Sequence, residues 1–169
     1  MADRMTPEQR HRCMSHIHSR NTRPEMLVRR YLYAHGFRYR VNVRRLPGTP
    51  DIVLGRLHTC IFINGCFWHG HEGCSDFKLP RTNTAFWQQK IDRNRQRDLE
   101  RQQQLRLMGW NVIRIWGCQL KTKARQEETL QGLLATLSHI TLVGYGLREQ
   151  PEQQLLVAED EEHYGKRSI

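Results

Sequence analysis

The spacing of apolar residues changes along the chain, and each change predicts a different element. Apolar residues recur at helical spacing over residues 27–32, and Pro24 is favourable in the first turn of a helix. Residues 37–43 alternate between apolar and polar side chains, which predicts a half-buried strand. A short apolar stretch, 52–54, predicts a second strand, and the continuous apolar run 59–63 predicts a strand in the centre of a sheet.

The second half of the chain is predicted to contain two helices with a strand between them. Residues 84–108 form one long polar helix that ends at Gly109, residues 110–116 form a strand, and residues 124–137 form a last helix. The fold class is therefore α/β, with a mixed sheet flanked by helices and a functional site at strand ends. We expect three parts: a basic arm (1–23), a single domain (24–146) and an acidic, flexible tail (147–169).

The net charge of the chain indicates a class of binding partner. The chain carries 27 Lys and Arg against 17 Asp and Glu, a net charge of +10. Three basic and six acidic residues give segment 147–169 a charge of −3, so the rest of the chain carries +13. A domain this basic is expected to bind nucleic acid, because neutralised phosphates release condensed counterions. The alternative is a basic surface that serves only solubility.

The chain lacks the patterns of membrane and secreted proteins. No apolar run reaches the roughly 18–20 residues of a membrane span, and residues 1–30 are polar and rich in arginine. We therefore expect a cytoplasmic protein that associates with the nucleoid when it binds DNA.

Four cysteine and histidine residues have the spacing of metal ligands. Three of them fall within nine residues of a glycine-rich loop, and the fourth follows a predicted strand; they are Cys66, His71, Cys74 and Cys118. A Cys3His set of this kind is typical of a closed, structural Zn²⁺ site. The alternative is three reduced core thiols that lie near an exposed histidine by chance. Cys60, inside an apolar run, is expected to be a core thiol.

Several acidic residues and one histidine could carry hydrolytic chemistry. Asp51 begins a strand after a Pro/Gly turn, where a carboxylate could hold Mg²⁺ or could simply be a turn residue. His69 could move a proton from water, or could be a surface residue or a substitute zinc ligand. Asp98 shares the predicted buried face of its helix, so it needs a partner such as His69. Glu25 could belong to the site or only complement the dipole of its helix.

Adjacent aromatic residues in the Cys/His loop suggest contact with bases. Phe67 and Trp68 stand in an otherwise polar stretch, where core packing would ordinarily use one of them. Exposed aromatic or apolar side chains can insert between base steps and unstack them. Met14, alone in the basic arm, could be a second wedge or an ordinary apolar residue.

These motifs together resemble the very-short-patch mismatch repair endonucleases of bacteria. The resemblance extends from about Thr6 to Lys121, and the motifs that carry it are Pro47-Gly48-Thr49-Pro50-Asp51, Asn64-Gly65-Cys66-Phe67-Trp68-His69-Gly70-His71, Phe77-Lys78-Leu79-Pro80, Phe86-Trp87, Lys90-Ile91, Arg97-Asp98 and Gly109-Trp110. The resemblance implies a restriction-endonuclease-like fold with a structural zinc site. It also implies a magnesium-dependent endonuclease that nicks double-stranded DNA on the 5′ side of the thymine in T:G mismatches, which arise when 5-methylcytosine deaminates.

The resemblance also assigns roles to single residues. Asp51 corresponds to the magnesium-binding aspartate, and the main-chain carbonyl of Ile63 to a second magnesium ligand. His69 corresponds to the catalytic histidine, Asp98 to the acid that supports it, and Glu25 to an auxiliary acidic residue. The zinc ligands correspond to Cys66, His71, Cys74 and Cys118, and the DNA wedge to Phe67, Trp68 and Met14. The implied partner is mismatched DNA bound by a monomer, with a possible link to a cytosine-5 methyltransferase and general mismatch repair proteins.

The chain departs from the family pattern at a few positions. Family members often have Thr and His where this chain has Ile63 and Asn64, which preserves a carbonyl ligand but not a role for a histidine side chain. One extra residue precedes Cys74, so a slightly altered zinc loop is expected. Two alternatives stay open: a related restriction-type or patrol endonuclease with another target, and a zinc-stabilised DNA-binding module without catalysis.

Overall fold

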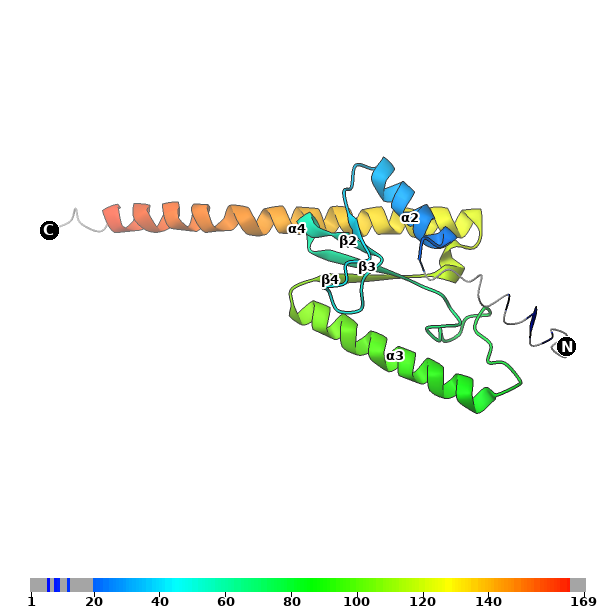
Figure 1. Ribbon diagram of the computed structural model, residues 1–169. Helices are drawn as coiled ribbons and strands as arrows, with labels where there is room; N and C mark the ends of the chain where they lie inside the picture. The colour runs from blue at the N-terminus through cyan, green and yellow to red at the C-terminus, as the bar shows by residue number, and fades with distance from the viewer. Residues whose placement is uncertain (1–5, 7, 10–11, 13–19, 165–169) are drawn as a thin grey trace.

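The protein folds as a four-stranded mixed sheet with helices on both faces (Figure 1). The computed structural model describes residues 6, 8–9, 12 and 20–164. In chain order the elements are α2 (Arg23–Ala34), β1 (Arg40–Val41), β2 (Ile52–Leu54), the 3-10 helix η1 (Gly55–Leu57), β3 (Thr59–Asn64), α3 (Thr84–Leu107), β4 (Asn111–Trp116), the 3-10 helix η2 (Gly117–Leu120) and α4 (Lys123–Tyr164). The predicted fold class is confirmed.

The strands lie in the order β1-β2-β3-β4, so the apolar run that predicted a central strand does form one. β2 pairs antiparallel with β1 and β3, whereas β4 pairs parallel with β3 over six residues from Thr59↔Asn111 to Asn64↔Trp116. A parallel pair needs a long crossover connection, and α3 supplies it. The crossover also explains why the loop after β3 and the residues after β4 meet at the same end of the sheet.

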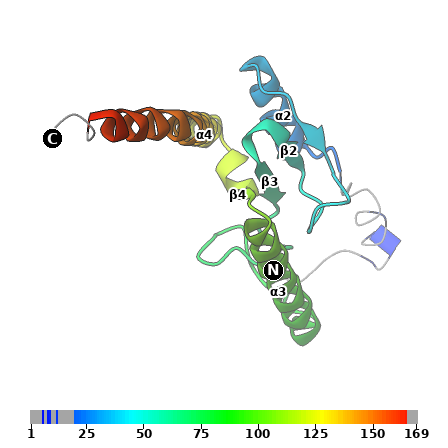
Figure 2. The same cartoon turned by 90° about the vertical axis from the view of Figure 1, so that its left-hand side faces the viewer.

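Alternation along the strands divides the core into two layers. Ile52, Leu54 and Ile61 point to one face, where they pack with apolar residues of α2 and α4 such as Leu32 and Leu137. The intervening residues point to the opposite face and contact α3; the buried members of that layer are Leu46, Val53, Cys60 and Leu105. Figures 1 and 2 show the sheet between α3 on one side and α2 with the first part of α4 on the other.

The structure differs from the sequence prediction at two elements. The strand predicted over 37–43 is reduced to Arg40–Val41, because its partner β2 has only three residues and lies just after Pro50, which lacks an N–H. The helix predicted to end at Leu137 continues to Tyr164 and has no break at residue 147. Glu, Gln, Leu and Ala are strong helix formers and dominate this segment. Over the described residues, no helix combines the length and the apolar character that crossing a membrane requires.

Candidate active site and metal centre

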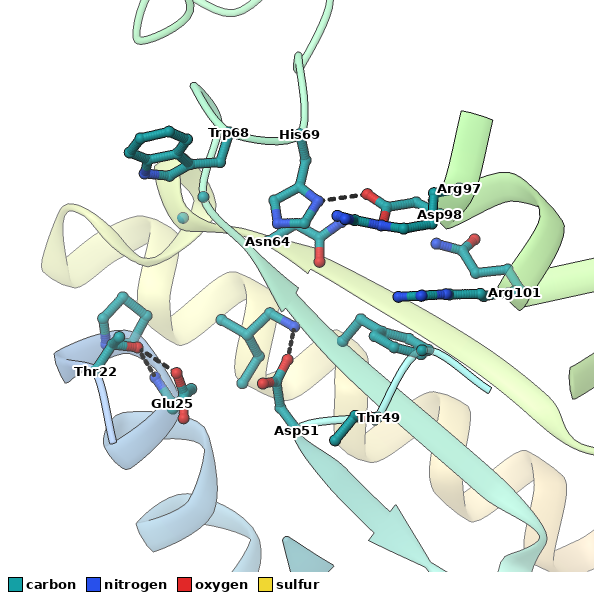
Figure 3. A pocket seen from close by; sticks show the side chains of 17 residues that line it. Thr22, Glu25, Thr49, Asp51, Asn64, Trp68, His69, Arg97, Asp98 and Arg101 are labelled. Carbon is teal, nitrogen blue, oxygen red and sulfur yellow. Dashed lines mark hydrogen bonds and ion pairs between the residues drawn. The ribbon is translucent and has the colours of Figure 1, made fainter. Parts of the chain in front are cut away.

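A pocket of about 640 Å³ lies at the end of the sheet where β3 leads into the Cys/His loop. It brings together six residues that the sequence proposed for the site: Glu25, Asp51, Ile63, Trp68, His69 and Asp98. Figure 3 shows Asp51 at the base of the pocket, His69 above it, and Asp98 reaching in from α3. These six residues, which are up to 73 positions apart in the chain, therefore share one cavity.

Asp51 lies at the start of β2 with its carboxylate in a largely desolvated position. The main-chain N–H of Ile63 donates to Asp51 Oδ2 at 2.8 Å. Burial raises the pKa of Asp51 to about 6; the hydrogen bond from Ile63 opposes this shift, and the nearby Glu25 carboxylate adds to it. A cation beside this buried carboxylate would stabilise its ionised form more than it would stabilise that of an exposed carboxylate.

The β2–β3 register leaves the Ile63 carbonyl without a ladder donor from the β2 side. Extending the β2–β3 register by two positions beyond Ile52↔Ile61 places Ile63 opposite Pro50. Proline has no N–H, so the neighbouring chain supplies no ladder donor there. A carboxylate and a main-chain carbonyl are both hard oxygen ligands, which suit Mg²⁺. The donor set therefore fits the magnesium site that the resemblance implies.

His69 and Asp98 form a polar pair at the opposite wall of the pocket. His69 Nδ1 contacts Asp98 Oδ2, and because a carboxylate can only accept, the histidine is the donor. The two side chains are 27% and 18% exposed, so the pair is partly shielded from water. With Nδ1 engaged, Nε2 is the nitrogen that can exchange a proton with a ligand. The position of Asp98 on the buried face of its helix predicted a partner such as His69, and the structure confirms that partner.

Helix α3 also fixes the backbone that carries His69. Asn94 Nδ2 donates to the carbonyl of Trp68 at 3.0 Å, and Arg95 Nε donates to the carbonyl of Gly70 at 3.0 Å. Gly70 has a φ of +59°, and a Cβ added there would lie 2.3 Å from Arg95 Nε. Gly70 thus permits both the left-handed turn and the close approach of α3. These contacts between α3 and the backbone around His69 were not predicted from the sequence.

Glu25 is held by protein groups on both of its oxygens. Thr22 is the N-cap of α2, and its hydroxyl donates to Glu25 Oε1 at 2.8 Å. Arg29 Nη2 and the main-chain N–H of Asn21 donate to Oε2 at 2.9 and 3.0 Å. Glu25 therefore ties down the segment that leads into α2 and forms a buried ion pair with Arg29 at the pocket wall. Its role as an auxiliary residue of the site stays a prediction.

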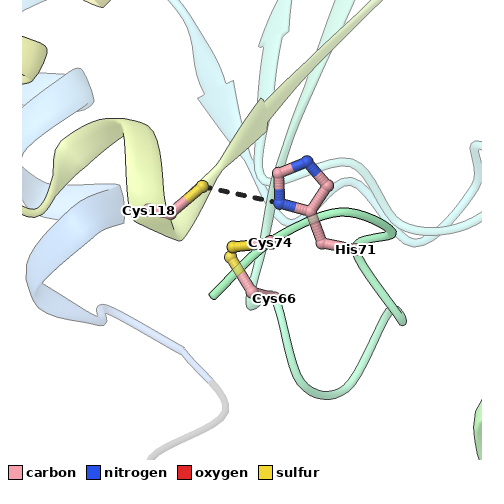
Figure 4. Close-up of side chains that lie close together, drawn as sticks. All are labelled: Cys66, His71, Cys74 and Cys118. Carbon is pink, nitrogen blue, oxygen red and sulfur yellow. Dashed lines mark hydrogen bonds between the residues drawn. The ribbon is translucent and has the colours of Figure 1, made fainter. Parts of the chain in front are cut away.

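The four predicted zinc ligands come together as a compact cluster (Figure 4). Their candidate ligand atoms all lie within 4.8 Å of one another, and Cys118 Sγ is 3.5 Å from His71 Nδ1. Ligands of a tetrahedral zinc ion, with Zn–S bonds of about 2.3 Å, are separated by roughly 3.8 Å. The geometry and the Cys3His chemistry therefore fit zinc. The cluster joins the loop after β3 to η2 after β4, and the ring of His71 stacks on Trp116 with ring centroids 4.0 Å apart.

The aromatic residues of the loop pack as a group beside the pocket. Phe67 and Trp68 are in edge contact, with ring centroids 5.1 Å apart, and both contact Trp87 of α3. Lys90 Nζ lies 5.3 Å from the centre of the Trp87 ring. Trp68 lines the pocket, whereas Phe67 does not. Met14, the third predicted wedge residue, lies outside the described residues.

Two pocket residues of α3, Arg101 and Gln102, were not singled out from the sequence. A signal was present for Gln102, because Asp98, Gln102 and Leu105 follow one another at helical spacing. The stripe that identified Asp98 as a buried acid therefore also contains Gln102. Its place in a run of three glutamines on a polar helix concealed it.

The fold and the pocket define a class of protein. A four-stranded mixed sheet flanked by helices, with Asp51, His69 and Asp98 gathered in one pocket at the end of the sheet, fits a restriction-endonuclease-like fold. The chain belongs to the Vsr family: the family model described as DNA mismatch endonuclease Vsr matches residues 2–75, and full-length relatives extend the similarity to most of the chain.

Three relatives show how far the similarity extends. The DNA mismatch endonuclease Vsr of Escherichia coli is 36% identical over 154 residues, which cover 91% of this chain and 96% of that protein. The type II nicking enzyme V.NmeAIP of Neisseria meningitidis is 46% identical over 134 residues, covering 79% and 95% of the two chains. The type II nicking enzyme V.XorIIP of Xanthomonas oryzae is 42% identical over 134 residues, covering 79% and 98%.

Proposed function

We propose that this protein is a magnesium-dependent DNA mismatch endonuclease that nicks double-stranded DNA 5′ of the thymine in a T:G pair and so initiates short-patch repair. The observation that carries the proposal is the convergence of Asp51, Ile63 and the His69–Asp98 pair on one cavity. Relatives that are named as a mismatch endonuclease and as nicking enzymes, and that match most of this chain, support the same activity.

The residues divide the chemistry between the two sides of the pocket. The Asp51 carboxylate and the Ile63 carbonyl would hold Mg²⁺, which when bound lowers the pKa of water and offsets charge on the phosphate. His69 Nε2 accepts a proton from the attacking water. Asp98 fixes the tautomer of His69 and stabilises the imidazolium that results, because it accepts from Nδ1.

The zinc site and the aromatic group would have supporting roles. Zinc held by the four-residue cluster would fix the loop in which Phe67, Trp68 and His69 lie between Cys66 and His71. Phe67 and Trp68, with Met14, would act as the wedge. A T:G pair stacks poorly, so the cost of opening the helix there is lower than at a matched pair. Selection of the mismatch would then come partly from deformability.

A panel of duplexes tests the activity. The protein should nick a T:G duplex in the presence of Mg²⁺, and it should nick the T:A and methylated C:G duplexes much more slowly. Equal nicking of matched duplexes would favour a related nuclease with another target. Binding without nicking would favour a DNA-binding module without catalysis.

Two variants separate the roles within the site. Asp51→Ala should abolish nicking and leave affinity for the mismatch nearly intact, because it removes a metal ligand and no phosphate contact. His69→Ala should strongly lower the rate at unchanged zinc content. If affinity falls as far as the rate in the first variant, or if zinc is lost in the second, the roles are misassigned.

We further propose that the protein acts as a monomer in the cytoplasm, alongside a cytosine-5 methyltransferase and general mismatch repair proteins. Deamination of the methylated base would generate the T:G substrate. Sedimentation of the protein with and without a T:G duplex tests the monomer, because a dimer would double the mass of the free protein and add a second 20.1 kDa chain to the complex.

A further inference from the structure

Two buried amide side chains in the pocket have no hydrogen-bond partner among the described residues. Among the described residues, five polar or charged side chains are buried, namely Glu25, Arg29, Thr59, Asn64 and Gln102. Glu25 and Arg29 bind each other, and the Thr59 hydroxyl donates to a main-chain carbonyl. Asn64 and Gln102 are 5% and 6% exposed and line the pocket, and neither has a side-chain hydrogen bond within the part of the chain that the structure describes.

The small exposed surface of these amides opens into the pocket. The sole fully buried side-chain nitrogen or oxygen without a partner, among the described residues, is Nε of Arg29. The amide atoms of Asn64 and Gln102 are therefore not fully enclosed, although the two residues as a whole are buried. Amides that open into a cavity and make no hydrogen bond to the described residues can donate to and accept from a ligand that enters the pocket.

Gln102 lies on the face of α3 that carries the catalytic pair. It is four residues after Asp98, which places the two side chains one above the other along the pocket wall. The amide offers two N–H donors and brings no further negative charge toward Asp51. These are the properties that an acceptor-only group such as a phosphodiester requires.

Arg101, the neighbour of Gln102, supplies a positive charge at the rim of the same pocket. Figure 3 shows Arg97, Asp98 and Arg101 reaching into the pocket from α3. Arg97 Nη2 lies 3.9 Å from Asp98 Oδ1, whereas Arg101 has no carboxylate within ion-pair distance among the described residues. A Cβ added at Gly48 would lie 3.3 Å from Arg101 Cβ, so Arg101 packs on the turn that leads to Asp51.

We propose that Arg101 and Gln102 bind the backbone of the DNA strand in this pocket. Arg101 pairs with a phosphate at the rim, and the Gln102 amide donates to a non-bridging oxygen of the phosphodiester that faces Asp51 and His69. A guanidinium and a neutral amide are common donors to phosphate oxygens. The inference rests on the proposed function and adds the contacts that position its substrate.

A volume-matched substitution tests Gln102. Gln102→Met should lower the single-turnover rate of T:G nicking at saturating enzyme by tenfold or more. Its thermal midpoint should be close to that of wild type or higher, because the substitution keeps the volume of the side chain and removes an amide that makes no hydrogen bond to the described residues. Gln103→Met is the matched control, since Gln103 is exposed on the same helix, and it should behave as wild type in both measurements.

A charged variant keeps the test decisive if Gln102→Met is unstable. Gln102→Glu has nearly the same shape but replaces the donors with a carboxylate, so it should nick more slowly than Gln102→Met. A rate within twofold of wild type in either variant would overturn the role of Gln102. A lower midpoint for Gln102→Met combined with wild-type nicking by Gln102→Glu would mark Gln102 as a structural residue.

The salt dependence of binding tests Arg101 without using catalysis. Arg101→Gln should weaken binding to T:G and T:A duplexes alike and reduce the slope of log K against log salt by about one. Arg101→Lys should restore most of the slope, and Arg106→Gln is the exposed control on the same helix. An unchanged slope for Arg101→Gln would overturn its phosphate contact. A wild-type protein that binds but does not nick would overturn the proposed function instead.

Discussion

Gly70 should be the position of the Cys/His loop least tolerant of a side chain. Its φ is +59°, and a Cβ built there would lie 2.3 Å from Arg95 Nε and 2.6 Å from Ile91 Cγ2. The left-handed conformation costs a non-glycine residue about 1–2 kcal/mol, and overpacking adds about 1–3 kcal/mol. We therefore expect Gly70→Ala to lower the free energy of unfolding by about 2–5 kcal/mol. In a protein of this size the thermal midpoint should fall by roughly 4–20 °C.

The same substitution should affect catalysis more than stability alone explains. His69 precedes Gly70, and a shift of about 1 Å in a catalytic group can reduce a rate by about 100-fold. Single-turnover nicking should therefore be measured at a temperature at which the variant is fully folded. A Gly70→Ala protein that nicks at the wild-type rate would refute the idea that this close approach positions His69.

Gly73 provides a matched control in the same loop. It has a φ of +68°, but no atom of the described residues lies within 4 Å of an added Cβ. Gly73→Ala should pay the conformational cost alone, about 1–2 kcal/mol, and should retain nicking. Equal destabilisation by the two substitutions would show that α3 yields readily and that the packing at Gly70 is unimportant.

Three further predictions concern the site. Burial raises the pKa of Asp51 from 3.8 to about 6, so its ionisation lowers the stability of the fold progressively between pH 4 and pH 6, and the full cost is present above pH 6. Asp51→Asn should therefore stabilise the metal-free protein at pH 8 by up to about 3 kcal/mol, with a gain that vanishes toward pH 4 in denaturant titrations. Purified protein should contain about one zinc per chain, and removing the zinc with a chelator or by Cys118→Ala should lower the thermal midpoint. Elemental analysis that finds no zinc would contradict this prediction. Trp68→Ala should weaken T:G binding and nicking together, because stacking on a base contributes about 1–3 kcal/mol, and it should leave the zinc content and the affinity for matched duplex unchanged. A variant that still distinguishes T:G from T:A duplexes as well as wild type would make Trp68 a packing residue.

The spacing of apolar residues predicted the sheet and its helices because burial of both faces of the sheet requires that spacing. The alternation of Ile52, Val53 and Leu54 between the two core layers follows from the pleat, and the continuous apolar run of β3 follows from helices on both faces. The strand predicted over 37–43 failed for a different reason. Phe37 and Tyr39 do pack against the core, as their alternation indicates, but pairing requires a partner that the short β2 does not supply.

The candidate site was predictable only where a residue type limits its own surroundings. Cysteines at ligand spacing and a carboxylate on a buried helical face have few alternatives, so the metal cluster and the partner of Asp98 could be anticipated. Glu25 was ambiguous because one carboxylate can cap a helix, pair with Arg29 or face a ligand. Gln102 was not predicted because its candidacy rests on being buried in the pocket without a hydrogen-bond partner among the described residues, which only the tertiary structure reveals.

Helix α3 has a mechanical consequence for the way this chain can change. Trp87, which contacts the aromatic wedge candidates, and Asp98, which holds His69, are separated by 11 residues, or about three whole turns. The two therefore point in the same direction from a single rigid rod. Inserting or deleting one residue between them would rotate one end by about 100° relative to the other, so Trp87 could no longer contact Phe67 and Trp68 while Asp98 holds His69. Substitutions can accumulate on the exposed side of this helix, but its length between these two residues is fixed.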